Sequence, residues 1–133
     1  MDEETIESFS KYRLEKAKET LETAEAILKL GKDYTSANNR AYYAIFHAIR
    51  AVLALEGVDF KRHKDVIGYF NGHYIKNEIF PKKMNNKITQ ASRIREDSDY
   101  DDEYNPSFEK TQNQIDTAKE LIKLVEKYIE NKE

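Results

Sequence analysis

The chain has 133 residues, which is enough for one domain with a single core, and it contains no cysteine. The lack of cysteine excludes disulfides, a thiolate nucleophile and cysteine-ligated metal sites, and it favours a cytoplasmic location. Charged residues make up 35% of the chain, with 22 Lys and Arg against 25 Asp and Glu and a formal net charge of −3. This balance is not that of a protein that holds long nucleic acids by bulk positive charge, so any such contact has to be local.

No segment has the pattern of a targeting or membrane-spanning element. The N-terminal residues MDEETIESFS are acidic and polar, unlike a secretory signal peptide. The longest apolar run, from Ala41 to Leu55, is too short and too charged to cross a bilayer. We therefore expect one helical domain over residues 1–133 that makes no membrane contact.

The first two predicted helices are joined by a short turn. Apolar residues at 3-4-3-4 spacing predict a helix over about residues 3 to 30, followed by Gly31 at the position where a left-handed glycine ends helices. The turn residues 34–36 (Tyr-Thr-Ser) offer N-cap chemistry for a central helix from about 36 to 56, which Gly57 ends. The inner positions of the first helix are Leu14, Ala17, Leu21, Ala24 and Leu28.

Three further helices are predicted in the second half of the chain. The first covers about 63–77 and is weakened by Gly68 and Gly72, since each glycine costs about 1 kcal/mol relative to alanine. Pro81 suits the first turn of a helix over about 81–97, and Pro106 opens a last helix after an acidic loop, Asp97 to Asn105. No run alternates with the period of a strand. The prediction is an all-α, up-and-down bundle of about five helices, with the first and last helices adjacent and antiparallel to the central one.

The central helix carries a narrow polar stripe on an otherwise apolar surface. At about 100° per residue, the stripe falls in a sector roughly 80° wide. Burying its charged groups without partners would cost several kcal/mol, so the stripe needs either partners or a ligand. Its members are Ser36, Arg40, Tyr43, His47, Arg50 and Ala54.

Three residues of the stripe form a candidate catalytic set, namely Arg40, Tyr43 and His47. An arginine can neutralise a phosphate, a histidine can exchange protons near neutral pH, and a tyrosine hydroxyl can orient a substrate. These are the parts of a metal-independent ribonuclease, in which the 2′-hydroxyl of the RNA attacks the adjacent phosphate. Seven residues of helix separate Arg40 from His47 by about 10.5 Å along the axis, so the two would flank a ligand. A second copy across a twofold axis would bring four such groups into one cleft.

Other basic residues are candidates for binding RNA or a nucleotide. They are Arg50 on the stripe, His63 in a basic run at residues 61–64, and Arg95 beside Arg93. The alternative is structural: Arg40 or Arg50 pairs with Asp97 or Asp99, and His47 is a hydrogen-bonded core residue. Both interpretations stay open at this point.

Metal and cofactor chemistry has little support in the sequence. The chain contains no glycine-rich phosphate loop, no HExxH and no GxSxG pattern. Four closely spaced carboxylates could hold a divalent cation, but such groups in a short loop are more often solvated or salt-bridged. They are Asp97, Asp99, Asp101 and Asp102. We expect no metal site and no cofactor.

The central segment, residues 36–53 (SANNRAYYAIFHAIRAVL), resembles the signature of HEPN-domain proteins, in their small single-domain prokaryotic branch. Downstream, residues 63–70 continue the similarity, and Arg95 with Asp99 and Tyr100 resembles that branch's R-x-x-x-D-Y element. The resemblance implies a bundle of four or five helices that frequently dimerises. It also implies frequent pairing with a minimal nucleotidyltransferase as toxin and antitoxin.

Active HEPN ribonucleases carry an arginine, four to six residues, and then a histidine, and residues 40–47 (RAYYAIFH) satisfy that pattern with six. The resemblance thus implies an endoribonuclease that acts at Arg40 and His47. Two features depart from it: Ala41 follows the arginine where a polar residue is usual, and the toxin branch usually carries its catalytic motif on a later helix. A non-catalytic nucleotide-binding or protein-interaction module with a structural Arg/His stripe is the alternative.

Overall fold

The computed structural model describes residues 2–100 and 105–132, with the backbone alone for 98–100, and the regular elements of this part of the chain are all helices. It confirms the predicted all-α bundle. The elements are α1 (Glu3–Lys29), α2 (Tyr34–Ala54), α3 (His63–Phe70), the π-helix η1 (Asn71–Ile75), α4 (Lys83–Tyr100) and α5 (Phe108–Lys132).

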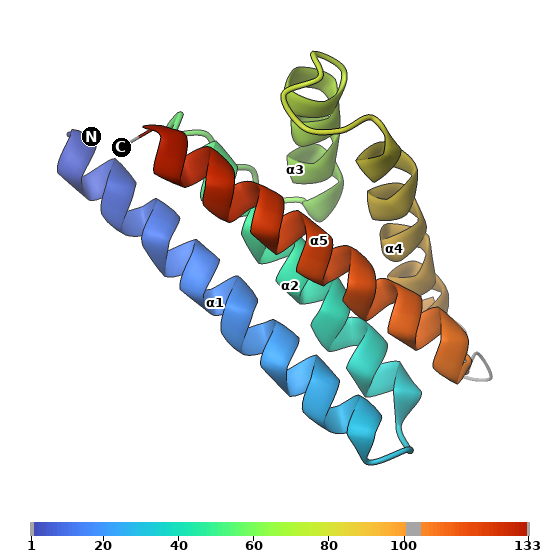
Figure 1. Cartoon of the computed structure of the whole chain (residues 1–133). Helices are drawn as coiled ribbons and strands as arrows, with labels where there is room; N and C mark the ends of the chain where they lie inside the picture. Colours follow the sequence, from blue (N-terminus) through green and yellow to red (C-terminus); the bar gives the residue numbers. More distant parts are fainter. Residues whose placement is uncertain (1, 101–104, 133) are drawn as a thin grey trace.

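Helix α2 is the central element and contacts α1, α3, α4 and α5 (Figure 1). The long helices α1, α2 and α5 lie side by side, and the pair formed by α3 and α4 stands at one side of them. None of the described helices is both long and apolar enough to cross a membrane.

The last helix runs parallel to α2, so the predicted antiparallel arrangement is wrong for α5. Asn38 near the start of α2 is hydrogen-bonded to Thr111 near the start of α5, and the rings of Tyr34 and Phe108 meet at 5.9 Å. Helix α1 does run antiparallel to α2, since the Ser10 hydroxyl donates to a backbone carbonyl near the end of α2. The cause is α4, which carries the chain back toward the end of the bundle where α2 begins (Figure 1).

The core follows the predicted inner positions of the helices. The predicted inner residues of α1 are buried, and Met84, Ile88, Ala91 and Ile94 form the buried face of α4. On α2, five alanines have no exposed surface, which lets the neighbouring helices approach closely. They are Ala37, Ala41, Ala44, Ala48 and Ala51.

Several helix ends differ from the prediction by a few residues. The N-cap of α2 is Asp33, whose carboxylate accepts from the backbone N–H and the hydroxyl of Ser36 at 3.3 and 2.7 Å. Helix α5 begins after Ser107, whose hydroxyl accepts from the N–H of Lys110, and not at Pro106. Gly31 and Gly57 have φ near +70°, as their predicted positions after helix ends require.

The predicted helix over 63–77 is two elements, because the backbone changes from α3 to a π-turn. The N–H of Lys76 donates to the carbonyl of Asn71, five residues earlier, at 2.9 Å. Helix α4 begins two residues after Pro81 and continues through Tyr100, so the loop predicted from Asp97 starts later than expected. Residues 101–104 of that loop lie outside the described residues.

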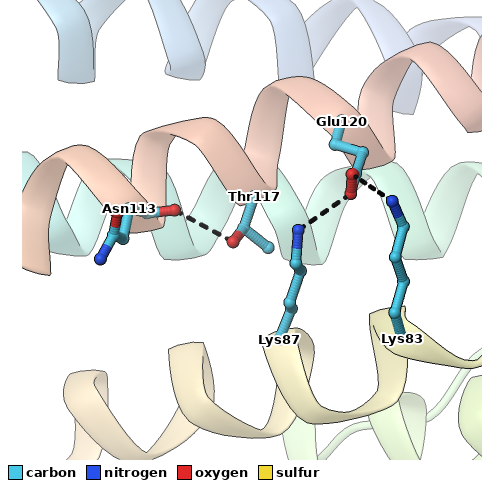
Figure 2. A network of polar contacts seen from close by, with 5 residues as sticks. All are labelled: Lys83, Lys87, Asn113, Thr117 and Glu120. Atoms are coloured by element: carbon cyan, nitrogen blue, oxygen red, sulfur yellow. Dashed lines mark hydrogen bonds and ion pairs between the residues drawn. The ribbon is translucent and has the colours of Figure 1, made fainter.

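Two lysines of α4 hold one carboxylate of α5. Lys83 and Lys87, one helical turn apart, reach Glu120 at 3.2 and 3.1 Å (Figure 2). On the same helix, the Thr117 hydroxyl donates to the backbone carbonyl of Asn113 at 3.0 Å (Figure 2). These contacts fix α4, which carries Arg95, relative to the three long helices.

Candidate active site

The predicted polar stripe is the part of the α2 surface that stays accessible after the helices pack. Between Ala41 and Leu53 every residue is buried except Tyr43, His47 and Arg50. Arg40, one turn before Tyr43, is exposed. The packing of the helices therefore leaves open the same sector that the sequence pattern marked out.

His47 lies among positive charges in the middle of the stripe. Burial, and then the charges of Arg13, Arg50, Lys16 and Arg40, lower the pKa of His47 to about 4. Its Nδ1 atom is buried and has no hydrogen-bond partner in the described part of the chain. At neutral pH the imidazole is thus uncharged and retains a nitrogen that can accept a proton.

Tyr43 joins two arginines from different helices. The guanidinium group of Arg40 lies over its ring at 5.2 Å from the centroid, and that of Arg95 lies 5.7 Å away. Arg95 also donates a hydrogen bond to the Tyr43 hydroxyl at 3.3 Å. The predicted catalytic Tyr43 and the predicted RNA-binding Arg95 are therefore in direct contact.

His63 begins α3, as predicted, and stacks on α2. Its ring lies on that of Phe46, with centroids 3.9 Å apart, and Tyr42 and the ring Nδ1 are hydrogen-bonded at 3.0 Å. Burial raises the pKa of Tyr42 to about 12, so its hydroxyl keeps a proton to donate. Burial and the charges of Arg95 and Arg50 lower the pKa of His63. This histidine is neutral and held in place.

Arg50 has a structural partner, but it is not one that the sequence suggested. Its guanidinium group pairs with Asp59 in the loop after α2 and lies 5.6 Å from the centroid of Phe46. Asp97 is exposed on α4, and the side chain of Asp99 lies outside the described residues. Arg50 therefore pairs with Asp59 and not with Asp97. The alternative pairings of Arg40 or Arg50 with Asp99 fall on a side chain outside the described residues.

Two basic residues of α1 belong to the site and were missed from the sequence. The charges of Arg13 and Lys16 lower the pKa of His47, and the charge of Arg50 lowers that of Arg13. They lie three residues apart on α1, beside its apolar face. That spacing indicates that the two side chains lie on one face of α1. Which face of α1 meets the stripe depends on how α1 is rotated against α2, and the sequence does not give that rotation.

The structure brings the six predicted site residues to one side of α2, together with Arg13 and Lys16. Phosphate is the ligand that such a group of cations around a neutral imidazole favours. In the described part of the chain, no three side chains of His, Asp or Glu gather as metal ligands. Of the four carboxylates considered from the sequence, only the side chain of Asp97 is described.

The chain is similar to several proteins of bacteria and archaea. The "UPF0332 protein" of Thermotoga maritima is 29% identical over 125 residues, 94% of each chain. "Putative toxin MJ0605" of Methanocaldococcus jannaschii is 36% identical over 88 residues, 65% of this chain and 64% of the relative. "UPF0332 protein PH1297" of Pyrococcus horikoshii is 39% identical over 75 residues, 56% of this chain and 51% of the relative.

A family model described as the HEPN domain matches residues 10–128, which span all five α-helices in whole or in part. The match includes Arg40, His47 and the other predicted site residues. It agrees with the helical bundle and with the stripe that α2 leaves open. The chain belongs to the HEPN-domain family.

Proposed function

We propose that this protein is a metal-independent endoribonuclease that acts through Arg40, Tyr43 and His47. The observation that carries the proposal is His47: an uncharged imidazole with an unpartnered buried nitrogen, surrounded by four cationic side chains on two helices. A purely structural histidine would be expected to have both ring nitrogens satisfied or exposed to water. The four cations around His47 repel one another, and a bound anion offsets this repulsion.

The residues fit attack by the 2′-hydroxyl of RNA on the adjacent phosphate. His47 accepts the 2′-hydroxyl proton, the 2′-oxygen bonds to phosphorus, and the bond to the 5′-oxygen breaks. Arg40 and Arg50 stabilise the charge of the pentacovalent phosphorus. Tyr43, held between Arg40 and Arg95, orients the phosphate through its hydroxyl. The products are a 2′,3′-cyclic phosphate and a free 5′-hydroxyl.

A homodimer is part of the proposal. The leaving 5′-oxygen needs a proton from the side opposite the attacking oxygen, and one histidine cannot serve both positions. A second copy that meets the half-exposed stripe across a twofold axis supplies a second His47 for that step. The bound phosphate offsets the neighbouring cations, so this second imidazole carries a proton and gives it to the leaving oxygen. Arg40 and His47 of one copy lie about 10.5 Å apart along α2. In the dimer, Arg40 of one copy can lie near His47 of the other, so both can act on one phosphate.

We also propose that the protein is the toxin of a toxin–antitoxin pair whose antitoxin is a minimal nucleotidyltransferase. Two relatives from Methanocaldococcus jannaschii carry toxin names, and one matches 64% of its own length. Expression of the wild-type chain should arrest growth of a bacterial host, and expression of Arg40→Ala should not. Growth arrest by both proteins would show that the toxicity does not depend on Arg40.

The direct test is cleavage of single-stranded RNA in the presence of EDTA. We expect products with a 2′,3′-cyclic phosphate, because the nucleophile belongs to the substrate and the proton carriers are histidines. Substrates with 2′-deoxy or 2′-O-methyl sugars should remain intact. Cleavage of a 2′-deoxy substrate would rule out this mechanism, because that substrate has no internal nucleophile.

The second candidate function is a non-catalytic nucleotide-binding or protein-interaction module. Two predicted site residues favour this alternative because their side chains already have partners within the fold. Arg50 is paired with Asp59, and His63 is stacked on Phe46 and hydrogen-bonded to Tyr42. Under this alternative, RNA or a nucleotide binds but remains uncut under every metal condition.

A further inference from the structure

A hollow of about 180 Å³ lies next to the stripe, between α1, the end of α2 and the loop that follows α2. Arg50 lines it, so the hollow and the stripe share a side chain. Arg13 of α1 lines it as well and acts electrostatically on His47. The hollow therefore adjoins the candidate active site through Arg50, on the side of α1.

The charges of the hollow do not balance. Arg13 and Arg50 contribute two positive charges, and Asp59, which pairs with Arg50, contributes one negative charge, which leaves one positive charge. No described carboxylate forms an ion pair with Arg13, whose guanidinium group lies 5.9 Å from the centroid of Tyr12. Burial and the charge of Arg50 lower the pKa of Arg13, and together they outweigh the charge of Asp59, which acts in the opposite direction.

The remaining lining of the hollow is apolar. Phe9 is 49% exposed, which is unusual for a phenylalanine, and it faces the hollow together with Ala54 and Val58. An exposed aromatic ring beside an uncompensated guanidinium group is the arrangement with which proteins hold single-stranded nucleic acid, with a base against the ring and a phosphate on the cation. An acidic peptide would use the cation but not the ring.

We propose that this hollow binds one nucleotide of the RNA strand next to the phosphate that is cleaved. Arg13 holds the phosphate of that nucleotide, and Phe9 and Val58 receive its base. The inference rests on the ribonuclease function proposed above, because Arg50 and His47 place the cleaved phosphate beside the hollow. On this proposal, the residues of α1 that line the hollow determine from which side the RNA strand enters the active site.

The test is the affinity of the full-length chain for a fluorescent single-stranded 2′-O-methyl RNA of mixed sequence, which cannot be cleaved. Affinity is measured by anisotropy at several salt concentrations. Phe9→Ala should weaken binding by about 5- to 100-fold, the range expected when one base–aromatic stack is lost. Arg13→Gln should weaken binding at low salt and reduce the slope of log K against log[salt] by about 1.

Two variants serve as matched controls. Phe108→Ala removes a phenylalanine of similar exposure, 51%, near the start of α5. Lys29→Gln removes an exposed charge from the far end of α1. Both should bind RNA like the wild type, and the melting curves of Phe9→Ala and Arg13→Gln should show that they are folded.

The outcomes separate this inference from the proposed function. If the wild type binds the RNA and both Phe9→Ala and Arg13→Gln bind equally well, the inference is wrong and the proposed function stands. If Phe9→Ala changes only the oligomeric state, the hollow is an interface between copies and the inference is again wrong. If the wild type neither binds this RNA nor cleaves unmodified RNA, the inference and the proposed function fail together.

Discussion

The surroundings of His47 decide the protonation state of its imidazole at neutral pH. Burial and four nearby cations on α1 and α2 lower its pKa to about 4, against about 6.5 in an unfolded chain. The histidine therefore starts the reaction as a base. A bound phosphate offsets the cations and favours the imidazolium ion that forms when the proton is transferred.

The same shift makes folding stability depend on pH. Between pH 6.5 and 4 the unfolded state binds more protons at position 47, so the free energy of unfolding should fall as the pH falls through this range. The shift of His63 acts in the same direction. Urea denaturation at pH 7 and pH 5 measures this effect, and His47→Gln should show a smaller difference between the two. An equal difference in both proteins would contradict the lowered pKa.

The pair between Arg50 and Asp59 should contribute little to stability. The side chain of Asp59 is 56% exposed, and exposed pairs contribute about 0–1 kcal/mol, against about 3–5 kcal/mol for removing one partner of a buried pair. Asp59→Asn keeps the shape of the side chain and removes its charge. We expect the free energy of unfolding to fall by no more than about 1 kcal/mol, and a loss three times as large would show that the pair is effectively buried.

At the scale of the helices, α4 is held to α5 by the carboxylate of Glu120 (Figure 2). Its two lysine partners lower the pKa of Glu120 despite its burial. Glu120→Gln should lower the free energy of unfolding by about 1 kcal/mol at low salt, and by less at high salt, since the pairs are partly exposed. The matched control is Glu130→Gln, an exposed site on the same helix. Equal losses in both variants would contradict a specific contact.

The helices and their inner faces were predictable because periodicity is a local property. The spacing of Leu14 to Leu28 predicted the buried face of α1, and the stripe from Arg40 to Arg50 predicted the open face of α2. Contacts between helices were not predictable, because they depend on how the helices cross and rotate. For this reason the parallel course of α5, the partner of Arg50 and the presence of Arg13 at the site emerge only from the structure.

At the scale of the whole molecule, the structure changes the reason for expecting a dimer. In the sequence, Tyr42, Tyr43 and Phe46 point in three different directions around the central helix, a pattern that predicts more apolar surface than a small bundle covers and so favours a dimer. In the structure Tyr42 and Phe46 are buried, with His63 stacked on Phe46. The dimer remains a prediction of the mechanism, which needs a second His47.

Light scattering at micromolar concentration tests this prediction. We expect the mass of two chains, about twice 15.6 kDa. A monomer at all concentrations that show activity would contradict the shared cleft. Mixing the wild-type chain with an excess of His47→Ala should lower the activity of the wild-type chain, because a mixed dimer keeps only one of the two His47 side chains that the mechanism needs.

The most direct test of the central claim compares two histidines in one cleavage assay. His73, on η1, stacks on Tyr69 with centroids 3.9 Å apart and has its Nδ1 3.0 Å from the carbonyl of Tyr69, so it serves as the matched control. We predict that His47→Ala loses RNA cleavage in EDTA while keeping a wild-type melting curve, and that His73→Ala cleaves like the wild type. Cleavage that survives His47→Ala at the wild-type rate would contradict the assignment of the active site.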